Sequence, residues 1–100
     1  MQDRTINDTN LTIGTTSQVV SQAIYGSTRV VISLQNISTG GQTISIAWGK
    51  DAEVNKGIVL GAGQSYILSK DAGYTPSDSQ ITAISNGANA ILALHEEIQE

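Results

Sequence analysis

The sequence contains no cysteine and no phenylalanine, and it has one histidine, one proline and one tryptophan. The lack of cysteine excludes a disulfide framework, a cysteine-ligated zinc site and a thiol nucleophile. A single histidine excludes the metal sites that are built from several imidazoles. Most familiar enzyme chemistry is therefore missing, and we expect a non-enzyme with no catalytic residues, no cofactor-binding residues, no cofactor and no metal ligands.

Charged residues are also scarce, at 14% of the chain where about 25% is usual in globular proteins. The formal net charge is -4, and Arg4 and Arg29 have no basic neighbours. Binding to nucleic acid or to an anionic membrane needs clustered lysine and arginine, so we expect neither partner. No stretch approaches the roughly 18 apolar residues of a membrane span, and the first residues lack the pattern of a signal peptide, so direct membrane insertion is not expected.

The abundant residue types are typical of β-structure. The chain has 13 Ile and 6 Val, set against 11 Ser, 10 Thr, 8 Gln and 6 Asn. Branched apolar side chains favour strands, and hydroxyl and amide groups supply a surface that is polar but neutral. One hundred residues allow a single domain with one modest core. Composition therefore predicts a small β domain that works by contact.

The chain divides into two parts by polarity. Residues 1–18 are polar apart from Ile6, Leu11 and Ile13, which predicts a polar N-terminal arm or an edge strand, and residues 19–100 form the sandwich domain. So few apolar groups offset little of the ordering cost of about 1–2 kcal/mol per residue. We therefore expect residues 1–15 to become ordered only against a neighbouring molecule.

Strict alternation of apolar and polar side chains marks two strands, near residues 30–34 and 44–48. We expect these two strands to pair antiparallel. The side chains on their apolar faces should be buried in the core: Ile32, Leu34, Ile44, Ile46 and Trp48. Four polar positions should instead point outward: Ser33, Thr43, Ser45 and Thr82.

Glycine and asparagine residues mark the predicted turns in the rest of the chain. Residues 61–64 predict a hairpin turn between two short apolar segments, and Asn86-Gly87 is a strong hairpin signal before the last segment. The charged residues 49–57 predict a surface loop. The last segment also has helix-forming residues, but a strand over 89–96 is favoured because the sheet otherwise lacks a partner for its final edge.

Short strands, glycine-rich turns and no convincing interior helix predict an all-β fold, an antiparallel β-sandwich and most simply a single jelly roll of about eight strands. Four segments have the same order and spacing of strands and turns as a known group of proteins: 29–36, 44–49, 57–66 and 81–85. From residue 28 to residue 96 the chain resembles small single-jelly-roll virion proteins of tailless icosahedral bacteriophages.

The resemblance implies a structural virion protein that is made in the host cytoplasm and located in the capsid. It implies a vertex (penton) subunit that closes into a homopentamer, or a capsid-decorating protein. Its partners would be copies of itself and other capsid proteins, such as the major capsid protein or a spike. No catalytic motif comes with the resemblance, and the residues of the subunit contacts stay unknown.

The alternative is a receptor-binding or carbohydrate-binding β-sandwich module. Such a module needs two or three exposed aromatic rings, and the chain offers Tyr25, Trp48, Tyr66 and Tyr74. Trp48 shares its face with two isoleucines and is predicted to lie in the core, whereas Tyr74 lies in a loop and should be exposed.

The sole imidazole, His95, precedes Glu96 and Glu97, which raises an acid–base or metal hypothesis. Positions 95 and 97 share a face on a strand, but without a nucleophile or further ligands a surface cluster at a strand end is the favoured interpretation.

Asp51 and Glu53 are the other spaced carboxylates, and they raise the hypothesis of a glycosidase pair or a calcium site. Lys50 and Lys56 lie in the same segment, which favours a solvated charge cluster. The glycines of residues 61–63 lack the third glycine of a dinucleotide-binding fingerprint and are interpreted as a turn.

Overall fold

A computed structural model describes residues 4–24, 26–73 and 76–99 of the chain, and apart from one short 3-10 turn the regular secondary structure of these residues is all β-strand. The elements are β1 (Arg4–Ile13), β2 (Gln18–Ser21), β3 (Thr28–Asn36), β4 (Ile44–Trp48), β5 (Ile58–Leu60), β6 (Ser65–Ser69), the single 3-10 turn η1 (Lys70–Ala72), β7 (Ile81–Ser85) and β8 (Ala90–Gln99). The last segment is therefore a strand, as predicted; it begins one residue after the predicted start and runs past the predicted end at residue 96.

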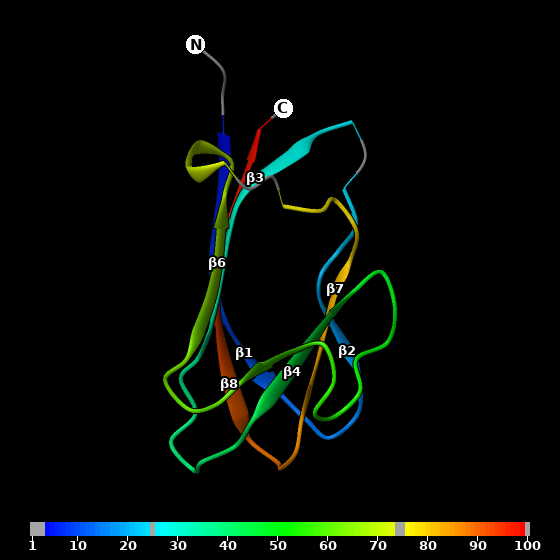
Figure 1. The fold of residues 1–100 in the computed structure, drawn as a ribbon, viewed down its shortest axis with the longest axis vertical. Coiled ribbons are helices and arrows are strands. Elements are labelled where there is room, and N and C mark those ends of the chain that lie inside the picture. The colour runs from blue at the N-terminus through cyan, green and yellow to red at the C-terminus, as the bar shows by residue number, and fades with distance from the viewer. Residues whose placement is uncertain (1–3, 25, 74–75, 100) are drawn as a thin grey trace.

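The eight strands form two four-stranded antiparallel sheets that face each other (Figure 1). Sheet A has the order β1-β8-β3-β6, and sheet B has the order β2-β7-β4-β5. This alternation between two sheets is the strand order of a jelly roll, so the predicted fold class is confirmed. The molecule is elongated, with extents of 43 × 23 × 21 Å.

Isoleucine and leucine side chains from both sheets fill the space between them. Four of the five predicted core residues are buried and belong to one cluster: Ile32, Leu34, Ile44 and Ile46. The fifth prediction is wrong in degree, because Trp48 is only half-buried at the rim of this cluster. It lies at the end of β4, beyond the part of that strand that β5 covers.

Several predicted strand pairings are wrong. β3 pairs with β8 and β6, whereas β4 pairs with β7 and β5, so β3 and β4 lie in opposite sheets. The predicted hairpins also fail: residues 61–64 join β5 to β6 across the two sheets, and residues 86–89 join β7 to β8 in the same way. The physical reason is that each of these turns crosses the sandwich, which buries both flanking strands against the core rather than against each other.

The charged segment 49–57 connects β4 to β5 and folds back over the outer face of sheet B. The Asn55 N–H donates to Ser45 Oγ at 2.9 Å, and Thr82 Oγ1 donates to the Lys50 carbonyl at 2.6 Å. Ser45 and Thr82 are consequently only 1% and 2% exposed. The prediction that these two residues face solvent is wrong, because the loop covers them; Ser33 and Thr43 are half-exposed.

β1 corresponds to the described part of the predicted arm. All ten of its residues pair with β8, so the ordering that was expected to need a neighbour is provided by the chain itself. Ile13 lies in the core and Leu11 packs against it, while the seven residues Arg4–Asn10 are exposed. Gln18 stabilises the corner after β1: its side chain accepts from the Gly14 N–H and donates to the Thr12 carbonyl.

Candidate functional site

His95 lies on the outer face of sheet A within a cluster of charged side chains. Its Nδ1 contacts Asp8 Oδ1 on the neighbouring strand β1, and its Nε2 lies 3.0 Å from Glu97 Oε2. Arg4 Nη1 donates to the other oxygen of Glu97 at 3.0 Å. These contacts tie β1 to β8 at two points along the strand.

The charges of this cluster shift the titration of two groups. The hydrogen bond to Glu97 and, to a smaller extent, the hydrogen bond to Asp8 raise the pKa of His95 above its usual 6.5. The hydrogen bonds from His95 and from Arg4 lower the pKa of Glu97 below its usual 4.5. An imidazolium held between two carboxylates is a cross-strand clamp, because only the protonated ring has two N–H donors.

Glu96, between these two residues, points to the opposite side of the strand and is buried. The sequence interpretation of two exposed carboxylates beside His95 is therefore wrong for Glu96. Its Oε2 accepts from Arg29 Nε at 3.1 Å and from Ser21 Oγ at 2.9 Å. Its Oε1 accepts from the Asn7 amide on β1 at 3.2 Å.

Arg29 is fully buried and lies at the centre of a polar network in which its guanidinium donates five hydrogen bonds. Besides Glu96 and Ser21, its guanidinium donates to the backbone carbonyls of Gln22, Ser77 and Ser79. The guanidinium carbon also lies 5.8 Å from the centroid of the Trp48 ring. Arg29 therefore fastens both sheets and the loop before β7 together.

Sequence reasoning treated Arg29 only as an isolated basic residue. The register between β3 and β8 shifts between Arg29 and Val31, so both Arg29 and Val30 are buried. A bulge of this kind turns a side chain inward out of sequence with the alternation. The alternation alone gives no signal of it.

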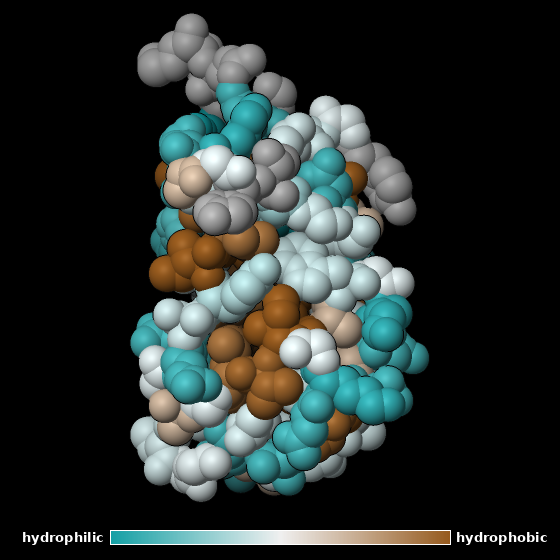
Figure 2. Space-filling model, viewed as in Figure 1, coloured by the Kyte–Doolittle hydropathy of each residue, from teal (hydrophilic) through white to brown (hydrophobic). Residues whose placement is uncertain are grey.

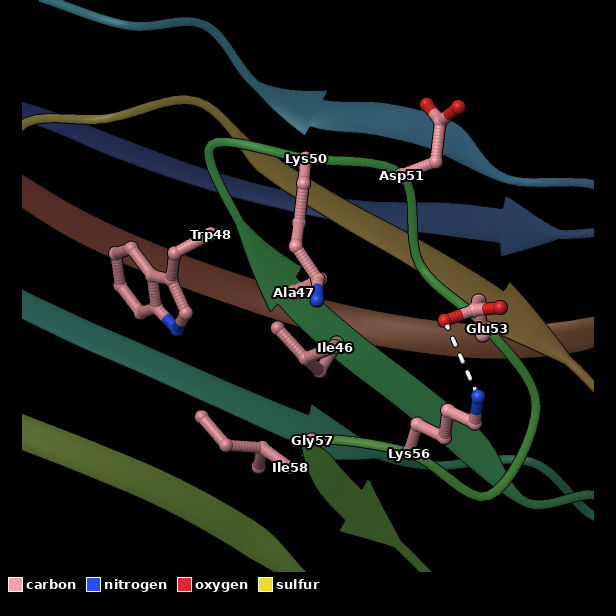
Figure 3. A pocket seen from close by; sticks show the side chains of 9 residues that line it. All are labelled: Ile46, Ala47, Trp48, Lys50, Asp51, Glu53, Lys56, Gly57 and Ile58. Carbon is pink, nitrogen blue, oxygen red and sulfur yellow. Dashed lines mark ion pairs between the residues drawn. The ribbon is translucent and has the colours of Figure 1, made fainter.

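Asp51 and Glu53 line a small cleft of about 240 Å³ beside β4, with Lys50, Lys56 and the half-buried Trp48. Figure 3 shows that Glu53 points toward Lys56, with which it forms an ion pair at 3.6 Å, while Asp51 points away from both. The two carboxylates do not converge on a common point, as a glycosidase pair or a calcium site requires. Among the residues that the structure describes, no group of three or more histidine, aspartate or glutamate side chains is placed to hold a metal ion.

The aromatic residues that the structure describes, Trp48 and Tyr66, do not form an exposed flat surface for a sugar. Tyr66 packs against the core cluster from β6, and Trp48 stacks near Arg29. Tyr25 and Tyr74, the latter predicted to be exposed, lie outside the described residues. The described part of the chain has no helix long enough and apolar enough to cross a membrane.

The outer strands of sheet A carry the two most exposed large apolar side chains of the described residues. Ile6 on β1 is 58% exposed and Ile67 on β6 is 61% exposed. In each case the isoleucine lies on the outer face of a strand that has a neighbour on one side only. On the face seen in Figure 2, apolar side chains gather over β6 and between β6 and β4, whereas polar ones cover the ends of the molecule. An uncovered strand with an exposed apolar side chain is a surface suited to pairing with another chain.

No family model and no curated protein matches the chain. Among solved structures, a chain of the Bacillus endospore appendages, described as disulfide-linked pili, aligns with a TM-score of 0.55 and 17% identity, over 99% of this chain and 88% of that one. A chain from the crystal structure of PirA aligns with a TM-score of 0.50 and 19% identity, over 91% and 92%. At these identities the likeness shows a shared fold.

These neighbours overturn the resemblance to phage virion proteins. They are an endospore appendage protein and PirA, not penton or capsid proteins. The derived predictions of a capsid vertex subunit, a homopentamer with capsid partners and a location in the virion are therefore wrong, and the receptor-binding or carbohydrate-binding alternative has no support either. The spacing of strands and turns that suggested the resemblance is a property of the jelly-roll fold. Proteins with one fold can form many different assemblies, so this spacing does not indicate which assembly this chain forms.

Proposed function

We propose that the protein is a non-enzymatic structural subunit that polymerises with copies of itself into a fibre. The observation that carries the proposal is that sheet A ends on both sides in an uncovered strand with an exposed isoleucine, Ile6 on β1 and Ile67 on β6. A sheet that can extend at both edges forms an open chain of subunits instead of a closed pair.

The fold shared with the endospore appendage protein supports this proposal, because those appendages are described as pili. By analogy we place the fibre outside the cell. Those pili are described as disulfide-linked, and the present chain has no cysteine. Its fibre would therefore be held together by backbone pairing and side-chain contacts alone, and reducing agents should not dissolve it.

A role without catalysis is part of the same proposal. The one imidazole of the chain contacts two carboxylates, and among the residues that the structure describes it has no hydroxyl as a hydrogen-bond partner. The buried network of Arg29 ties strands and a loop together and is closed off from solvent.

The test is to follow assembly of the purified chain over a concentration series by sedimentation velocity and negative-stain electron microscopy, with and without reductant. We expect fibres whose amount rises with concentration and does not change with reductant. Ile67→Lys and Ile6→Lys should each suppress them, because each places repeated charges at a contact. Val54→Lys is the matched control: Val54 is 41% exposed but lies in the loop over sheet B, so this variant should assemble normally. A protein that stays monomeric at millimolar concentration, or closes into rings, would refute the proposal.

A further inference from the structure

The free edge of β1 presents three outward side chains in the order Arg4, Ile6 and Asp8. They share a face because alternate residues of a strand point the same way, and all three residues are exposed. The middle one is apolar, and the flanking ones carry opposite charges.

A second copy can pair with this edge in the antiparallel direction through a two-fold axis perpendicular to the sheet. When the axis passes through Ile6, Ile6 faces Ile6 and Arg4 faces Asp8 on both sides of the axis. Moving the axis by one residue, to Thr5 or to Asn7, places Ile6 opposite a charged side chain. Opposite charges and apolar pairs directly across two strands are stabilising, so the sequence of the edge selects the axis at Ile6.

The contacts within the subunit leave both charged groups able to bind a partner. Asp8 contacts His95 through Oδ1, and its side chain is 71% exposed. Arg4 donates to Glu97 through Nη1, its Nη2 lies 3.9 Å from Asp71 Oδ2, and its side chain is 35% exposed. A carboxylate has several acceptor positions and a guanidinium has five N–H donors, so each can add a bond without losing the contacts it has.

We propose that β1 is a two-fold contact surface whose partner is β1 of a second copy, with the axis at Ile6. This inference rests on the proposed function, since it supplies one of the contacts from which the fibre is built. The two copies of sheet A join into one continuous sheet. Five described residues of each strand, Arg4–Asp8, face each other across this axis, so the contact is weak in an isolated pair and gains strength by repetition along an assembly.

A cysteine walk along the outer face of β1 tests the register, because the natural chain has no cysteine. Facing residues of antiparallel strands have Cα atoms about 4.5–5.5 Å apart, which a disulfide spans. Ile6→Cys should form a disulfide-linked dimer at least about fivefold faster than Asp8→Cys or Asn10→Cys under the same oxidising conditions. Equal rates for the three variants, or a faster reaction of either control, would overturn the inference.

A charge exchange tests the pairing independently. Arg4→Asp leaves two acidic residues on the edge, and Asp8→Arg leaves two basic ones, so each variant should repel itself. In a mixture, both facing pairs between the two variants are again of opposite charge. We expect native mass spectrometry to show hetero-dimers at least about threefold above either homo-dimer, with circular dichroism confirming that both variants are folded. A random mixture of dimers would contradict the axis at Ile6.

The outcomes separate this inference from the proposed function. If fibres form but the cysteine variants show no preference for the Ile6 register, the proposed fibre stands and the β1 contact is refuted. Dimers that obey the register but never grow leave the β1 contact intact and refute the fibre.

Discussion

Replacing Arg29 with methionine should greatly lower the free energy of unfolding of this protein. The substitution keeps much of the side-chain volume but leaves Glu96 buried without its counter-charge, at a place where the Nε–Oε2 distance is now 3.1 Å. Breaking a buried ion pair by removing one partner costs about 3–5 kcal/mol. For a domain of this size, total stability is about 5–15 kcal/mol, so the variant should lose about a fifth of it or more.

Arg4→Met is the matched control. Arg4 and Glu97 form an ion pair of nearly the same length, 3.0 Å, on the surface of the same sheet. Solvent screens this pair, and such exposed pairs contribute less than about 1 kcal/mol. The two variants therefore differ in burial far more than in chemistry.

The assay is urea-induced unfolding followed by circular dichroism and by the fluorescence of Trp48, the sole tryptophan. We expect the unfolding free energy of Arg29→Met to be at least about 2 kcal/mol below that of Arg4→Met. Adding Glu96→Leu to Arg29→Met should recover part of the loss, because the uncompensated charge is then gone. Similar stability of the two single variants would refute the reasoning that burial makes the Arg29 network indispensable.

Three further predictions concern stability. Ile46→Ala should cost about 2–5 kcal/mol in chemical denaturation and Ile67→Ala less than about 0.5 kcal/mol, since Ile46 is buried and Ile67 is exposed; equal costs would show that the core is placed wrongly. Gly57 has φ of 74°, and a Cβ there would lie 2.8 Å from the Ile46 carbonyl oxygen, so Gly57→Ala should cost about 1–3 kcal/mol, whereas Gly14→Ala, with open space around it, should change thermal stability little. The clamp of His95 should stabilise fully below pH 6.5 and be lost as pH rises through the raised pKa of His95, and the contribution of Glu97 should be present above pH 4.5 and be lost as pH falls through its lowered pKa. An NMR titration midpoint for His95 at or below 6.5, or an unchanged pH profile of stability in His95→Gln, would contradict this.

The fold class was predictable because the period of the side chains is a local property. Alternation placed Ile32, Leu34, Ile44 and Ile46 on inward faces, and all four are buried. The same logic failed for strand partners, since a turn such as residues 61–64 has the same glycines whether it joins neighbours in one sheet or crosses to the other.

The polar surface shows the same division. The sequence correctly put Ser45 and Thr82 on the face opposite the core, but it contained no sign that the loop 49–57 would cover them. It also placed His95 and Glu97 on one face, without indicating that Asp8 and Arg4, 87 and 93 positions away from them, complete the cluster.

By itself, the sequence determined a cysteine-free all-β domain of one core with a neutral polar surface, because composition and alternation act within single strands. Only the tertiary structure decided which strands lie at the edges of sheet A, and that Arg29 turns inward at a bulge to bind Glu96. Both are matters of register between segments far apart in the chain, and register depends on how the whole sandwich packs.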